Sequence, residues 1–178
     1  MPKTNLACTR HLARTQQRLI ERQEFSREMF GSNTKVVYDK IKKRFARDVS
    51  YRSSAEFTSA LQRYGHDVDK LVCWLSFVTD CLVQCYSGNC RLCMSYSLVC
   101  KGDSMRSYLP KEHSKVFMSL EDKQKLRTCL ALRFSRAAIE STKFNSNTQK
   151  CEAVNRAYIK SVPKSVTYSR NYLSLIHI

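Results

Sequence analysis

The chain has 178 residues, of which 43% are hydrophobic, so it can form one compact domain with a core and is not wholly disordered. Four Gly and three Pro are too few for a turn-rich β-sandwich or barrel, and we predict a mainly α fold. Lys and Arg number 31 against 15 Asp and Glu, a formal net charge of +16. This charge favours a nucleic acid as partner, because each cation near a phosphate releases a condensed counterion.

An anionic membrane surface would also attract so basic a chain. No segment, however, is apolar over the length that spans a bilayer, and we expect no membrane-embedded part. The N-terminal residues lack the apolar stretch of a signal peptide, which predicts an intracellular protein. In a reducing compartment, clustered cysteines more often bind metal than form disulfides.

The N-terminal part of the sequence predicts a helix from about Asn5 to Phe30 that ends at Gly31. Four of its arginines recur every four residues and so share one face: Arg10, Arg14, Arg18 and Arg22. Such a row of arginines is commonly a solvated face, and it can also follow a phosphate backbone.

Three more helices are predicted before the cysteines. The first spans about residues 33–51, capped by Ser32 or Asn33, and its core stripe is Val37, Ile41, Phe45 and Val49. The second spans about residues 53–64 and is broken by Gly65. Asp67 then begins a helix that is apolar nearly all round, which we expect to be the central, buried helix.

After the segment that contains the clustered cysteines, the sequence again predicts helices. Ser119-Leu-Glu-Asp has the pattern of a capped helix start, and that helix continues to Phe134. A short helical piece is predicted over 137–140. A last helix is predicted from Asn147 to Val162, where Pro163 stops it, followed by an extended stretch at residues 165–168.

The strongest local pattern is Cys85-x4-Cys90-x2-Cys93-x6-Cys100. A Cys-x2-Cys pair presents two thiolates to one ion from a single turn, and two further cysteines complete the tetrahedral shell of a structural Zn²⁺. Gly88 and Asn89 supply the tight turn before the pair. Buried reduced thiols are the alternative interpretation, but four of them in a polar segment are hard to bury as hydrophobes. Cys81, one helical turn before Cys85, could replace it as a ligand.

Two further segments carry a resemblance to a known family. Asn147-Thr-Gln-Lys-Cys-Glu-Ala-Val-Asn-Arg156, followed by Pro163-Lys-Ser-Val-Thr-Tyr-Ser-Arg170, resembles the last block of animal Mutator-like DDE transposases, in the C-terminal part of their catalytic region. The segment from Cys85 to Cys100 resembles the Cys-rich insertion of that family. Cys8-x2-His11 is similar to its Cys-x2-His element, although two ligands alone do not make a site.

The resemblance implies an RNase H-like core interrupted by a helical insertion. Residues 1–146 would be this insertion, with the Cys-rich loop at 81–100, and residues 147–172 would be a helix and strand of the catalytic core. Glu152 would be the last of three carboxylates that hold two Mg²⁺ ions in the intact enzyme. The residues expected near DNA are Lys150, Asn155, Arg156, Lys164 and Arg170. The family also implies a nuclear protein, and the intact transposase could be a homo-oligomer.

The two Asp residues of the family pattern would lie upstream of Cys8, and none of the seven residues before Cys8 is acidic. One carboxylate cannot hold a metal pair, so we expect this chain not to catalyse transposition alone. Residues 173–178 resemble a translated sequencing adapter and are expected to be a non-native tail. Two alternatives remain: a non-enzymatic basic zinc module that binds nucleic acid, and a helical interaction domain whose charge only keeps it soluble.

Overall fold

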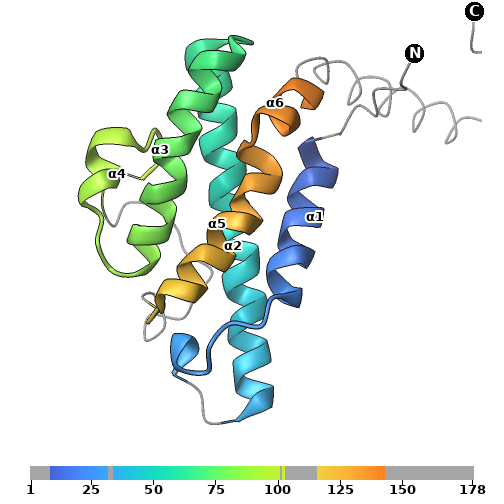
Figure 1. Cartoon of the computed structure of the whole chain (residues 1–178), viewed down its shortest axis with the longest axis vertical. Helices are drawn as coiled ribbons and strands as arrows, with labels where there is room; N and C mark the ends of the chain where they lie inside the picture. Colours follow the sequence, from blue (N-terminus) through green and yellow to red (C-terminus); the bar gives the residue numbers. More distant parts are fainter. Residues whose placement is uncertain (1–8, 32–33, 101, 103–115, 143–178) are drawn as a thin grey trace, which may run out of the picture. The chain divides into compact units, whose positions relative to one another are not determined.

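The computed structural model describes residues 9–31, 34–100, 102 and 116–142, and every element in these ranges is a helix (Figure 1). The elements are α1 (Thr9–Arg22), the 3-10 helix η1 (Glu28–Phe30), α2 (Lys35–Tyr64), α3 (Val68–Tyr86), α4 (Arg91–Tyr96), α5 (Leu120–Phe134) and α6 (Arg136–Thr142). The predicted mainly α fold is confirmed for this part of the chain. None of its helices is long and apolar enough to cross a membrane.

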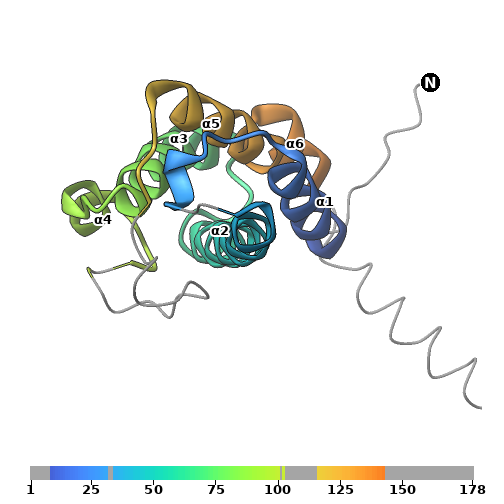
Figure 2. The same cartoon turned by 90° about the horizontal axis from the view of Figure 1, so that it is seen from below.

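Four of the helices, α1, α2, α3 and α5, form an up-and-down bundle. Each is packed against two neighbours, in the cyclic order α1, α2, α3, α5. Figure 2 shows α2 and α5 across from each other, with α1 and α3 on either side. Consecutive helices of the bundle run antiparallel; the three residues between α2 and α3 leave no room for another arrangement, whereas the connection from α3 to α5 is long and contains α4. The small α4 lies on the outer side of α3, and α6 extends α5 against α3 (Figure 1).

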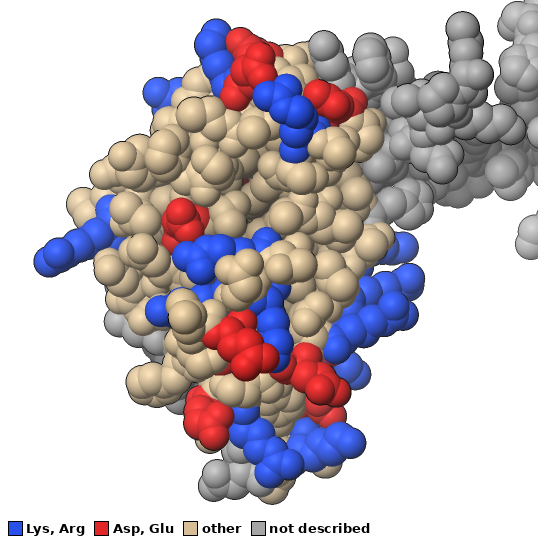
Figure 3. All heavy atoms as spheres, viewed as in Figure 1, with Lys and Arg blue, Asp and Glu red and all other residues tan. Residues whose placement is uncertain are grey.

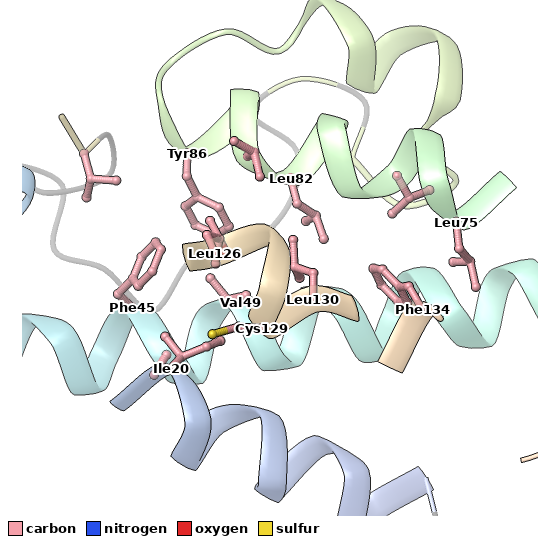
Figure 4. Close-up of a cluster of buried hydrophobic side chains, with 14 of the residues drawn as sticks. Ile20, Phe45, Val49, Leu75, Leu82, Tyr86, Leu126, Cys129, Leu130 and Phe134 are labelled. Carbon is pink, nitrogen blue, oxygen red and sulfur yellow. The ribbon is translucent and has the colours of Figure 1, made fainter. Parts of the chain in front are cut away.

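The bundle core is filled by apolar side chains from all four helices (Figure 4). The central ones are Ile20 from α1, Phe45 and Val49 from α2, Leu75, Leu82 and Tyr86 from α3, and Leu126, Cys129, Leu130 and Phe134 from α5. Phe45 meets Phe25, Phe30 and Tyr86 in edge-to-face contacts, with ring centroids 5.1–6.1 Å apart. Each fully buried side chain of this size stabilises the fold by about 1.5–3 kcal/mol.

Helix α2 is one continuous element of 30 residues, so the predicted break between residues 51 and 53 is wrong. Ser53 and Ser54 do not cap a new helix. Their hydroxyls instead donate to the carbonyls of Val49 and Ser50 in the preceding turn, each at 2.7 Å. Serines bonded back in this way are tolerated inside a helix, and the sequence alone does not distinguish them from caps. The cap of α2 in the described residues is Thr34, which accepts from the Val37 amide at 3.4 Å.

Val37 does not belong to the core stripe that the sequence predicted, because its side chain is 46% exposed. The first turn of α2 extends beyond the neighbouring helices, and Val36 is also exposed there. The other three predicted members, Ile41, Phe45 and Val49, are buried.

Helix α1 ends at Arg22, earlier than predicted, and the chain passes through an irregular stretch into η1. Side chains from other helices satisfy the backbone of this stretch. The Ser26 amide and hydroxyl donate to Asp122 at 2.8 and 2.6 Å, and Tyr38 donates to the Phe25 carbonyl at 2.8 Å. Gly31 then ends η1 with a left-handed φ of 57°, at the position that the sequence indicated.

The starts of α3 and α5 are those predicted from their caps. Asp67 accepts from the Lys70 amide at 3.1 Å, and Ser119 forms a capping box with Asp122. The short helical piece predicted over 137–140 lies within α6.

The prediction that the helix after Asp67 is central and buried all round is wrong, because α3 occupies a corner of the bundle and Phe77 is 43% exposed. Its apolar outer face is partly covered by α4, where Tyr96 stacks on Phe77 with ring centroids 4.8 Å apart.

Candidate metal centre

Four thiols converge on the outer side of α3, in what we call the Cys-rich segment (residues 85–100). Cys85 lies in the last turn of α3, Cys90 at the start of α4, Cys93 within α4, and Cys100 after α4. Their four Sγ atoms all lie within 4.8 Å of one another. A zinc tetrathiolate has Zn–S bonds of about 2.3 Å, so neighbouring sulfurs are about 3.8 Å apart. The cluster could therefore hold a metal ion with small adjustments of its side chains.

The local backbone explains why these thiols meet. Gly88 has a φ of 92°, a left-handed conformation that only glycine adopts easily, and its amide donates to the Cys85 carbonyl at 2.9 Å. Asn89 then donates its amide to the Gln84 carbonyl at 2.9 Å, and its side chain accepts from the Arg91 amide at 3.1 Å. The chain reverses at the end of α3, so that the Cys-x2-Cys pair faces the last turn of that helix.

Cys81 lies beneath the cluster. It is buried and packs beside Cys93 and Cys100, and its backbone carbonyl accepts from the Cys93 thiol at 3.6 Å. The set of four Sγ atoms within 4.8 Å contains Cys85 and not Cys81. The geometry therefore favours Cys85 over Cys81 as the fourth ligand.

The surroundings of the cluster favour a thiolate at Cys85. A hydrogen bond from Cys93, together with the charge and N–H bond of Arg52, lowers the pKa of Cys85 to about 5, although burial opposes this shift. Burial raises the pKa of Cys90 to about 11, and it also raises the pKa of Cys100. Four thiolates this close would repel one another, so full deprotonation requires a bound cation.

Three buried polar residues of α2, spaced four apart, attach this region to the bundle: Asp48, Arg52 and Glu56, here called the polar ladder. Asp48 accepts from the buried Tyr86 hydroxyl at 2.5 Å. Residues four apart lie on one face of a helix, so all three point to α3 and the segment after it.

Arg52 lies in the middle of the polar ladder and contacts the cluster directly. Its guanidinium donates to Cys85 Sγ at 3.1 Å and lies over the Tyr86 ring, 4.9 Å from the centroid. The side chain is 7% exposed, and its Nε has no hydrogen-bond partner in the part of the chain that the structure describes. A charge-assisted N–H···S bond of this kind stabilises the thiolate form of Cys85.

Glu56 controls the position of Cys100 through Ser97. Its carboxylate accepts from the Ser97 hydroxyl and from the Leu98 amide, the latter at 3.0 Å. Ser97 Oγ in turn accepts from the Cys100 amide at 2.7 Å and the Val99 amide at 3.2 Å. Glu56 is 2% exposed, so these bonds form in a low-dielectric environment where they are strong and costly to lose.

The sequence interpretation missed the polar ladder, because it divided α2 at the serines that lie between Arg52 and Glu56. With α2 taken as one helix, the four-residue spacing would have placed Asp48, Arg52 and Glu56 on one face, although not its burial.

The other predicted site residues lie outside the described residues: Cys8, Glu152, Lys150, Asn155, Arg156, Lys164 and Arg170, together with the side chain of His11. The domain boundary at 146/147 and the tail at 173–178 also fall there, so these assignments stay predictions. Comparison with protein-family models, with curated proteins and with solved structures found no match to this chain.

Replacing Glu56 by Gln should lower the free energy of unfolding by about 1–3 kcal/mol, because an amide NH₂ would face the donors Ser97 and Leu98. Alkylation of the cluster thiols should also become faster, because Ser97, which accepts from the Cys100 amide, would no longer be held in place by the Glu56 carboxylate. Urea unfolding and timed alkylation would measure both effects. Glu140→Gln, on the exposed surface of α6, serves as control and should change neither. Equal behaviour of the two variants would contradict the role of Glu56.

Proposed function

We propose that this chain is a zinc-stabilised helical domain that binds DNA as part of a Mutator-like transposase. The observation that carries the zinc site is the convergence of Cys85, Cys90, Cys93 and Cys100 within 4.8 Å. Four soft sulfur donors suit Zn²⁺, and they leave no open coordination position. The ion would thus be structural and would take no part in catalysis.

A metal is needed for a physical reason. The described residues that follow α3, 87–100, pack in a small apolar cluster, in which Cys93 and Cys100 lie against Cys81 of α3 with Leu92 and Tyr96 beside them. So few apolar contacts hold a long connection weakly. Metal binding to a site that exists only in the folded state adds its free energy to folding.

The DNA-binding part of the proposal is supported by the formal charge of +16 and by the resemblance of residues 147–170 to the last transposase block. In an intact enzyme Glu152 would be a ligand of the catalytic Mg²⁺ pair within an RNase H-like core. Lys150, Asn155, Arg156, Lys164 and Arg170 would lie near the DNA. The described helices would be the insertion into that core, and the protein would act in the nucleus.

A second candidate is a non-enzymatic zinc module that binds nucleic acid. The same Cys cluster and the same charge favour it, and it needs no upstream carboxylates. Nicking of DNA that depends on a divalent metal would separate the two, since only an assembled enzyme carries it out.

The purified chain should contain one zinc ion, and chelation should lower its melting temperature because the bound ion stabilises only the folded state. Cys93→Ser should abolish zinc binding, since Cys93 is buried within the cluster. Cys73→Ser, at an exposed thiol on α3, should leave the zinc content unchanged. Elemental analysis and thermal unfolding would measure these effects. A zinc-free protein with freely reactive cluster thiols would refute the site.

Arg52→Met should weaken zinc binding about 10- to 100-fold, the usual effect of losing a hydrogen-bond donor to a metal ligand. The matched control is Arg133→Met. Arg133 is also a buried arginine, 3% exposed, but its guanidinium donates to Ser54 and lies over Phe57. Both variants should lose stability, and only Arg52→Met should lower the affinity in a chelator competition. Equal affinities would show that Arg52 is purely structural.

In a longer chain that supplies two upstream Asp residues, Glu152→Gln should abolish metal-dependent strand cleavage and spare DNA binding, because the amide is a poor Mg²⁺ ligand. A nicking assay with supercoiled DNA and a separate binding assay would measure this. Glu140→Gln is the control and should cleave normally. Retained cleavage by Glu152→Gln would remove the catalytic role.

A further inference from the structure

The cations of the described surface differ in whether they form ion pairs. Four of those on α3, α5 and α6 have carboxylate partners: Lys70 with Asp67 at 3.0 Å, Lys125 with Glu121 at 2.7 Å, Arg127 with Asp80 at 3.0 Å, and Arg136 with Asp69 at 2.5 Å. Those on the outer sides of α1 and α2 are different. Arg14, Arg18, Arg22, Lys40, Lys43 and Arg44 are exposed, and none of these six forms an ion pair with a residue that the structure describes.

We call these six residues the basic face. Helices α1 and α2 lie side by side, joined by a hydrogen bond from the Ser50 hydroxyl to the Ala13 carbonyl at 2.7 Å and by one from Lys42 Nζ to the Gln23 carbonyl at 3.4 Å. Figure 3 shows Lys and Arg side chains gathered beside the lower part of α1. The surplus charge of the described region is therefore concentrated on one pair of helices.

The spacing of the basic face suits a polymer of phosphates. The three arginines of α1 are four residues apart, which places them on one line at steps of about 6 Å. Lys40, Lys43 and Arg44 are exposed, whereas Ile41 and Phe45 of the same turns are buried, so the three cations lie on the outer side of α2. The acidic residue within this part of α1 is Glu21, which is half-buried and accepts from the Gln17 side chain at 2.9 Å.

We propose that the basic face binds the phosphate backbone of double-stranded DNA without reading its sequence. This inference rests on the proposed DNA binding and assigns a part of it to α1 and α2. On the described parts of α1 and α2 the exposed aromatic side chain is Tyr51, and a single ring falls short of the succession of stacking platforms on which single strands bind. The cations of the basic face need not break an ion pair with a described residue on binding, and each one that neutralises a phosphate releases counterions from the duplex.

The test removes three charges in two different ways. One triple variant, Arg14→Gln with Arg18→Gln and Lys43→Gln, alters the basic face. The other, Lys70→Gln with Lys125→Gln and Arg136→Gln, removes the same net charge from the ion-paired cations. Binding to a duplex of random sequence is measured at several salt concentrations, for the zinc-loaded full chain and both variants, and circular dichroism confirms that the helices are retained.

The basic-face variant should show a slope of log K against log salt that is shallower by about 3, with a loss of affinity on the order of 100-fold at 0.1 M salt. The ion-paired variant should keep the slope of the unaltered chain. If both variants lose affinity equally, binding depends on the net charge alone, and the proposed role of the basic face is overturned. If the basic-face variant loses binding to single-stranded DNA and keeps its affinity for the duplex, the inference is also overturned. Failure of the unaltered chain to bind DNA at low salt would instead refute the proposed function itself.

Discussion

The hydrogen bonds that the Glu56 carboxylate accepts from Ser97 and Leu98 are the constraint on which the Cys-rich segment depends. A carboxylate that is 2% exposed is stable only when donors replace its lost water, and here a hydroxyl and a backbone amide provide that replacement. Because Ser97 also accepts from the Cys100 amide, the position of the last cysteine follows from a residue on α2. The metal centre is thus built against the bundle, although its ligands are contiguous in sequence.

Arg52 adds an electrostatic reason for this arrangement. A buried guanidinium without a counter-charge would destabilise the fold, and here Arg52 donates to the sulfur of Cys85, whose pKa is lowered to about 5. A bound Zn²⁺ with four thiolates would carry a net charge of −2, which Arg52 would partly offset. The bundle and the Cys cluster therefore stabilise each other. The guanidinium of Arg52 stabilises the thiolate of Cys85, and that thiolate provides the counter-charge for the buried guanidinium.

The sequence predicted the features that local chemistry determines. The caps at Asp67 and Ser119, the turn at Gly88 and the approach of the Cys-x2-Cys pair to Cys85 each follow from a few adjacent residues. The wrong predictions concern places where contacts with residues distant in sequence determine the local structure. Ser53 and Ser54 are residue types that commonly cap helices. Here α2 continues through them, because α1 and α3 pack against it.

The same reason explains the other differences. Residues 24–26 leave the helix because Asp122, Lys125 and Tyr38 bind their backbone, and these partners lie up to 101 positions away along the chain. Arg52 and Glu56 were missed because a charged residue in a helix ordinarily faces solvent, and only the packing of α3 against α2 places them inside.

Helix α2 separates the two proposed functions spatially. Its inner face carries the polar ladder that holds the metal centre, and its outer face carries Lys40, Lys43 and Arg44. The contacts that fix α1 on α2, such as Ser50 with Ala13, do not involve the Cys-rich segment. Asp122 independently joins the end of α1 to α5. Loss of the metal should therefore loosen the far side of α3 first and leave the basic face assembled, so that metal binding and DNA binding can be impaired separately by different substitutions.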